Sequence, residues 1–346
     1  MGTKGIYIYG IVPNFYSPDM FRSLEKTKVY TIPYENISAI VSDRDDMDLD
    51  FHDRESLGHL LVHHQQTIEE LQSKDFAMFI PMQLGTIRSS KEEVLKILSE
   101  GYNLIIDSLK KIEYLTEIDL VVSWADFPEM LRELANHPDI VTLKESLMTN
   151  KASISQVDQV MVGMLVQEKI DEKNKLVELA ILDSLTSISI DIHTHDVMND
   201  QMILNSAFLI HRNKKEKFEH LIDILDETYH GLLNFKIVGP LPCYSFYTIE
   251  VKELLPEHVS WAKAELGLNE ETSESEIKKA YLGKAKMFHP DTYQDTDDGD
   301  KFNTIQKAYH TLQDYTAAVK QSSNAEIISL AKKDVIKSLT LVKIKD

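Results

Sequence analysis

Three histidines in the first quarter of the chain have a spacing that could hold a metal ion. His59 and His63 lie four residues apart in a segment with helical periodicity, so their side chains fall on one face, and His64 is adjacent. Histidines reach this spacing easily in any helix, and no third ligand is evident in the surrounding sequence. We therefore predict no metal at this position.

The other candidates for chemistry are also incomplete. His193 and His195 read as part of a loop before a strand, and Cys243 has no identifiable base beside it. A calcium loop is suggested by four acids but lacks its final glutamate: Asp295, Asp297, Asp298 and Asp300. The sequence contains no phosphate-binding glycine loop and no nucleophile elbow. We predict that the protein is not an enzyme and uses no cofactor, with a hydrolase built on the histidine pairs as the alternative.

The tripeptide His289-Pro290-Asp291 follows a segment with the pattern of a helix. Ser273 and Glu276 form an S-x-x-E capping box, which marks a helix start. Apolar residues then recur at helical spacing: Ile277, Ala280, Tyr281, Ala285 and Phe288. Pro290 disfavours α geometry for His289, so the helix over Ser275–Phe288 should end there and present the imidazole on a turn.

A second helix is predicted after an acidic loop, with apolar positions at Phe302, Ile305, Ala308, Tyr309 and Leu312. Between about Trp261 and Asp314 the arrangement resembles a J domain, the module that docks on Hsp70-type ATPases and stimulates them. The resemblance is carried by Glu265-Leu266-Gly267, Ile277-Lys278-Lys279-Ala280-Tyr281, the His-Pro-Asp turn, Lys301-Phe302 and Ala308-Tyr309. It implies that an Hsp70 partner contacts His289, Pro290, Asp291, Lys278 and Lys279.

Several positions depart from the J-domain pattern. Leu282, Gly283 and Met287 replace residues that are usually basic, and Lys284 and Lys286 stand where buried leucines are usual. Gly283 also costs about 1 kcal/mol of helix stability. We expect weaker stimulation of an Hsp70 than a typical J protein gives, and the alternative is a J-shaped module that only docks.

Composition limits the classes of partner. The chain has 346 residues, a net charge of −19 and 43% hydrophobic residues. The acidic balance argues against binding to nucleic acid or to anionic membranes, and no apolar run approaches membrane-spanning length. The single cysteine fits a reducing cytoplasm, and the N-terminus shows no signal peptide.

The body of the chain alternates strand and helix patterns, which predicts an α+β fold. Strands are expected near residues 5–12, 29–32, 37–41, 77–80 and 118–124, with helices from Asp53 and over about 90–112. Residues 128–185 read as helical, with breaks near His137-Pro138 and Asn150, and a smaller α+β unit follows. Each sheet is expected to have ferredoxin-like topology.

The segment Gly239-Pro240-Leu241-Pro242-Cys243-Tyr244-Ser245-Phe246 should be stiff, because two prolines fix φ. Leu241, Tyr244 and Phe246 then either pack back on their own domain or form a hydrophobic dock. This segment resembles the C-terminal signature of the gas-vesicle GvpF/GvpL family. Further landmarks in the same order agree over about residues 4–247: Tyr7-Ile8-Tyr9-Gly10-Ile11-Val12-Pro13, His63, Pro81-Met82-Gln83-Leu84-Gly85-Thr86 and Leu204-Asn205-Ser206-Ala207-Phe208-Leu209.

This second resemblance implies an accessory protein of gas vesicle assembly without catalysis. Its partners would be the hydrophobic shell subunit, with Leu241, Tyr244 and Phe246 as the speculative contact, and other vesicle proteins. The expected location is the cytoplasm and the gas vesicle. A general J-domain co-chaperone of Hsp70 with unrelated clients is the alternative.

The predicted organisation has four parts. Residues 1–126 form a ferredoxin-like α+β domain, and 127–250 form a long helical region with a second α+β domain. Residues 256–318 form a small all-α J-like helical hairpin. Residues 319–346 form a tail expected to be helical, because apolar residues recur in it.

Overall fold

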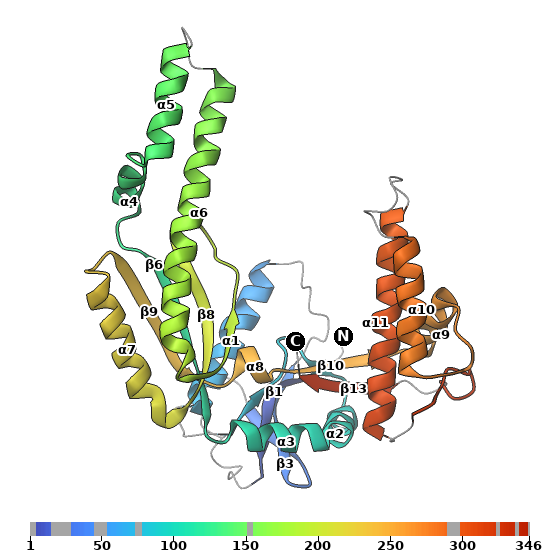
Figure 1. Cartoon of the computed structure of the whole chain (residues 1–346). Helices are drawn as coiled ribbons and strands as arrows, with labels where there is room; N and C mark the ends of the chain where they lie inside the picture. The colour runs from blue at the N-terminus through green and yellow to red at the C-terminus, as the bar shows by residue number, and fades with distance from the viewer. Residues whose placement is uncertain are drawn as a thin grey trace. The chain divides into compact units, whose positions relative to one another are not determined.

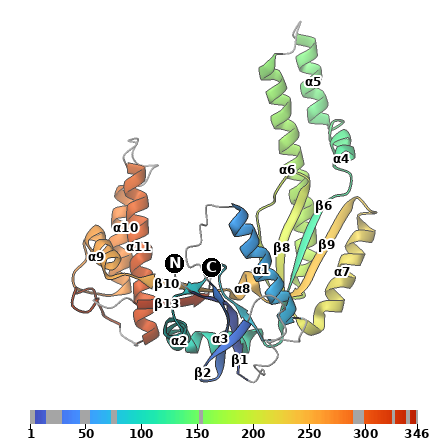
Figure 2. The ribbon, with the colours of Figure 1, turned by 180° about the vertical axis from the view of Figure 1, so that it is seen from behind.

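The computed structural model describes residues 5–14, 29–44, 54–72, 78–150, 155–288, 298–322, 326–335 and 339–344. The chain forms two compact units, one from residues 1–111 together with 247–346, and one from residues 112–246. The first unit is discontinuous in sequence and contains both the N-terminal sheet and the J-like helices (Figures 1 and 2).

The N-terminal sheet has the strand order β2-β3-β1-β4, with β5 also paired to β1, and its pairings are antiparallel. Buried β-branched and aromatic residues of β1 and β3 form its core, as the sequence predicts. The strands are β1 (Gly5–Pro13), β2 (Val29–Tyr34), β3 (Ile37–Arg44), β4 (Ile80–Pro81) and β5 (Ile87–Arg88); the helices are α1 (Arg54–Gln72), α2 (Lys91–Glu100) and α3 (Tyr102–Ile112).

The helix predicted over residues 90–112 is in fact two helices, because the chain breaks at Gly101. The Gly101 N–H closes α2 on the carbonyl of Ile97. A Cβ at Gly101 would lie 2.6 Å from Cγ1 of Val342, which belongs to the last strand of the chain. The break therefore coincides with a close approach between segments that are distant in sequence.

The second unit has the βαββαβ order of a ferredoxin-like fold, with strand order β7-β8-β6-β9 and antiparallel pairing throughout. Figure 1 shows α5 and α6 side by side, extending beyond the sheet of this unit. The elements are β6 (Leu115–Trp124), α4 (Phe127–Leu134), α5 (Pro138–Asn150), α6 (Gln156–Thr186), β7 (Ser189–Thr194), β8 (Met202–His211), α7 (Lys215–Thr228), β9 (Leu233–Leu241) and α8 (Tyr244–Tyr247), with a short 3₁₀ turn at Arg212–Lys214.

The predicted boundary at residue 126 is wrong. Strand β6 does not close the N-terminal sheet; it is a central strand of the second one, paired with both β8 and β9. Its inward residues pack in one core with Ile181 and Leu185 of α6: Ile118, Leu120, Val122 and Trp124. The expected breaks near His137-Pro138 and Asn150 are confirmed, since α5 spans Pro138–Asn150.

The J-like segment is inserted between two paired strands rather than appended. Strand β10 (Ile249–Leu254) precedes it and pairs antiparallel with β13 (Leu339–Ile344), which follows it. Between them lie α9 (Pro256–Leu266), β11 (Glu271–Thr272), α10 (Glu274–Met287), α11 (Asp298–Ser322) and β12 (Ile328–Ser329). The helical prediction for residues 319–346 is therefore wrong beyond Ser322, because the described residues there form two strands and a stretch of loop and turns over residues 330–335.

Candidate functional site

The three J-like helices enclose a common apolar core. Val259, Leu266, Ile277, Ile305 and Leu312 are buried in it, and the rings of Tyr281 and Tyr309 stack with centroids 4.2 Å apart. The predicted capping box is present: the Ser273 N–H donates to Glu276 Oε2 at 2.8 Å, and the Glu276 N–H donates to Ser273 Oγ at 3.4 Å. Ser273 and Glu276 thus fix the start of α10, as the sequence predicts.

The first turn of α10 is acidic, with Glu274 and Glu276, and basic and apolar side chains are exposed along the rest of the helix. Lys278 and Lys279 are exposed, and so are Leu282 and Met287. His289, Pro290 and Asp291, the other residues expected to contact an Hsp70, lie outside the described residues. The contact of Lys278 and Lys279 with an Hsp70 stays a prediction.

Lys284 replaces a residue that is usually a buried leucine, and its position explains how the module accepts it. The side chain is half-buried, and its Nζ donates to the backbone carbonyl of Glu265. That carbonyl lies in the last turn of α9, which ends at Gly267 in a left-handed conformation. The ammonium group therefore satisfies a free carbonyl at a helix C-terminus, where positive charge is favourable.

The residues after α11 complete the J-like core. Ile328, Leu330 and Val335 are buried in the same cluster as the helices, and β12 pairs with β11. The hydroxyl of Tyr315 donates to the carbonyl of Ser329 at 3.0 Å. We name residues 326–335 the strap. It is a structural part of the J-like module, which sequence reasoning missed.

The signature segment around Gly239 is held against the second sheet by a buried carboxylate. Glu117 on β6 accepts hydrogen bonds from the N–H of Ser245 at 2.8 Å and from its hydroxyl at 2.9 Å. Burial raises the pKa of Glu117 above its usual value, and the Ser245 N–H opposes that shift. The side chains of Leu241, Tyr244 and Phe246, the speculative shell-subunit contacts, are half-buried.

Cys243 lies within this segment and is buried. Burial raises the pKa of its thiol to about 12, and the nearby Glu117 acts in the same direction. A thiol of that pKa is not a nucleophile near neutral pH, since the thiolate is the reactive form.

The structure places the candidate histidines in different surroundings. His64 is buried with Nδ1 2.8 Å from the hydroxyl of Tyr7, whereas His59 is exposed on the same helix. His193 lies on strand β7, not in a loop, with its ring centroid 4.9 Å from that of His195. Within the described residues, no group of three or more His, Cys, Asp or Glu side chains could hold a metal ion.

A surface that sequence reasoning also missed lies on α5 and α6. Methionine and valine side chains near the start of α6 are exposed, with Met161 and Met164 lining a groove. Their apolar spacing in a helix is visible in the sequence. No helix among the described residues is both long and apolar enough to cross a bilayer.

The comparisons with known proteins match the two parts of the chain separately. The family model described as gas vesicle synthesis protein GvpL/GvpF matches residues 5–248, and that described as DnaJ domain matches residues 264–318. Gas vesicle protein F of Dolichospermum flosaquae is 21% identical over 248 residues, covering 71% of this chain and 98% of that protein. Chaperone protein DnaJ of Rickettsia akari is 47% identical over 49 residues, covering 14% of this chain and 13% of that protein.

A solved structure extends the similarity to three dimensions. The crystal structure of the gas vesicle protein GvpF from Anabaena sp. PCC7120 matches with a TM-score of 0.59 at 20% identity. The match covers 70% of this chain and 97% of that one, so the fold is shared over nearly the whole of the relative. The chain therefore belongs to the GvpL/GvpF family of gas vesicle synthesis proteins and carries a DnaJ domain in its C-terminal third.

Proposed function

We propose that the protein holds the hydrophobic shell subunit and other vesicle proteins in the cytoplasm during gas vesicle assembly, and that its J module recruits an Hsp70 to that complex. It does so by binding, without catalysis. The observation that carries the proposal is the presence of a GvpL/GvpF body and a DnaJ domain in one chain. A shell subunit with an apolar face aggregates in water unless that face is covered, which is the need such a holder would meet.

The structure supports the Hsp70 part through α10 and α11, the helices that precede and follow His289-Pro290-Asp291 in the chain. Their shared core and capping box fix α10 and α11, and Lys278 and Lys279 are exposed. Because both lysines are already on the surface, they can attract an acidic partner surface without any rearrangement of the module.

The first test is co-purification of the full-length protein with co-expressed shell subunit. Retention of the shell subunit, but not of an unrelated aggregation-prone protein, is the expected result. Equal retention of both would favour a general co-chaperone with unrelated clients. Retention of neither would refute the holding function.

The second test is stimulation of a cognate Hsp70 ATPase by the full-length protein. His289→Gln should abolish the stimulation. The matched control is His258→Gln, which changes an exposed histidine on α9 of the same module and should leave stimulation intact. Equal stimulation by wild type and His289→Gln would refute the recruiting role.

A further inference from the structure

An apolar stripe runs along the start of α6 and is not covered by the rest of its unit. Val157, Val160, Met161 and Met164 are 67%, 58%, 48% and 69% exposed. Because they are three or four residues apart, they lie on one face of the helix. Met148 on α5 is also exposed, at 67%. Exposed apolar residues are ordinary when they are scattered, but a contiguous set marks a binding surface.

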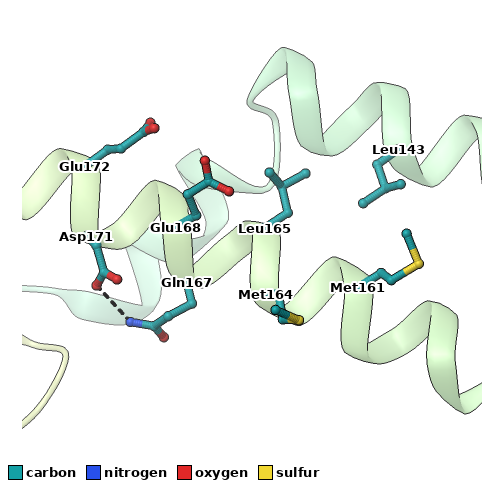
Figure 3. Close-up of a pocket in the computed structure, with 8 residues that line it drawn as sticks. All are labelled: Leu143, Met161, Met164, Leu165, Gln167, Glu168, Asp171 and Glu172. Carbon is teal, nitrogen blue, oxygen red and sulfur yellow. Dashed lines mark hydrogen bonds between the residues drawn. The ribbon is translucent and has the colours of Figure 1, made fainter. Parts of the chain in front are cut away.

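The stripe continues into a groove of about 700 Å³ along α5 and α6. Figure 3 shows Leu143 of α5 facing Met161, with Met164 and Leu165 beside them on α6. The other end of the groove is lined by polar and acidic side chains of α6, namely Gln167, Glu168, Asp171 and Glu172. The groove is thus apolar at one end and acidic at the other.

The acidic end keeps unneutralised charge. Glu172 forms an ion pair with Lys169, whose Nζ lies 3.0 Å from Glu172 Oε2. Asp171 Oδ1 accepts a hydrogen bond from Gln167 Nε2 at 3.0 Å. Glu168 is exposed, and among the described residues no lysine, arginine or histidine forms an ion pair with it. A cation placed at this end would therefore gain an interaction with Glu168 that the protein itself does not supply.

The walls of the groove favour a helical occupant over an extended one. Both walls are α-helices, whose backbone N–H and C=O groups are already paired within each helix. An extended segment would leave its own backbone groups unpaired against Met161 and Met164, whereas a helix satisfies its own. Methionine side chains also adapt to apolar surfaces of different shape.

We infer that this groove binds an amphipathic α-helix of a partner protein, with the apolar face of that helix over Met161 and Met164 and a lysine or arginine beside Glu168. A second copy of this chain is disfavoured, since each copy has a net charge of −19 and would bring acid to acid. That the partner is a vesicle protein rests on the proposed function, which this inference deepens.

The first experiment measures fluorescence anisotropy of a labelled leucine/lysine peptide of about 18 residues, or about five helical turns, with the full-length protein. The controls are a scrambled peptide of the same composition and a leucine/glutamate peptide with the same apolar face. We expect only the amphipathic basic peptide to bind. Equal binding of the scrambled or the acidic peptide, or no binding of any peptide, would overturn the inference.

Variants then locate the site. Met161→Glu combined with Met164→Glu should weaken peptide binding by about tenfold or more, since both side chains line the apolar end of the groove. Leu179→Glu is the matched control, because Leu179 is 51% exposed on the same helix but does not line the groove. Unchanged affinity of the double variant, or an equal loss in Leu179→Glu, would overturn the inference. All three side chains exchanged here are exposed, and circular dichroism checks that each variant folds.

Co-purification of the shell subunit separates the inference from the proposed function. If wild type retains the subunit and the double variant does not, the groove is the client site. If both retain it, the assignment of the groove to a vesicle client is wrong and the holding function stands. If the wild type does not retain the shell subunit while the peptide binds in the groove, the holding function is wrong. The groove then still binds amphipathic basic helices.

Discussion

Acidification should destabilise the first unit through His64. The His64 side chain is 5% exposed, with Nδ1 at 2.8 Å from the hydroxyl of Tyr7 and its ring stacked on that of Tyr9. Burial, and secondarily the neighbouring His63, lower its pKa from 6.5 to about 4. The folded protein therefore keeps this imidazole neutral where the unfolded chain would protonate it.

The sign and size of the effect follow from that shift. Above pH 6.5 the imidazole is neutral in both states, and the contribution to stability is complete. As the pH falls from 6.5 to about 4, the unfolded state takes up a proton that the folded state does not, so the free energy of unfolding falls. At about 1.4 kcal/mol per pH unit, the loss reaches about 3 kcal/mol, and it stops growing once the folded state also binds the proton.

The assay is hydrogen exchange of peptides from β1 and α1 in urea, which reports the stability of this unit separately from the other. His64→Asn should remove the pH dependence, because the asparagine carbonyl can accept from Tyr7 but does not titrate. His59→Asn, on the exposed side of the same helix, should leave the pH dependence unchanged. An identical slope between pH 6.5 and about 4 in wild type and His64→Asn would refute the reasoning.

Three further predictions concern the second unit, the strap and β13. Burial raises the pKa of Glu117, so the folded state binds a proton at higher pH than the unfolded state does. The free energy of unfolding of the second unit should therefore rise as the pH falls toward the pKa of the unfolded state. Glu117→Gln, which keeps contacts to Ser245, should remove that rise when hydrogen exchange in β6 is measured against pH. Leu330→Ala should cost about 3 kcal/mol of J-module stability by urea unfolding, since Leu330 is buried; an effect no larger than that of Lys333→Ala, an exposed position, would show that the strap is dispensable. Gly101→Ala should cost about 1–3 kcal/mol through its clash with Val342, and adding Val342→Ala should recover part of the lost thermal stability; no recovery would argue against that contact.

Local features of the fold could be predicted because they depend on residues close together in sequence. The capping box of Ser273 and Glu276 fixes the start of α10 through bonds across three residues. Pro138 begins α5, as a proline at the first helical position should. The strands β1 and β3 follow from runs of β-branched and aromatic residues, whose packing suits a pleated sheet.

Features that depend on distant partners could not be predicted. β10 and β13 pair across the whole J module, and nothing in the segment Leu339–Ile344 alone specifies that partner. β6 reads as the end of the first sheet because it follows α3, yet its ladder partners are β8 and β9. The periodicity of apolar residues identifies a strand. The sheet that the strand joins depends on which apolar surface elsewhere in the fold can cover its buried face.

The same distinction applies to the candidate sites. The resemblance drew attention to Leu241, Tyr244 and Phe246, but the segment that carries them is tied to Glu117 by two hydrogen bonds and includes the buried Cys243. Much of its apolar surface is thus already removed from water, and only surface still in water can yield binding free energy. Met161 and Met164 still expose their apolar surface to water, and the acidic end of the groove beside them favours a positively charged partner. On this physical ground the groove along α5 and α6 is the stronger candidate for holding a hydrophobic client, and the double variant with its Leu179 control distinguishes the two surfaces.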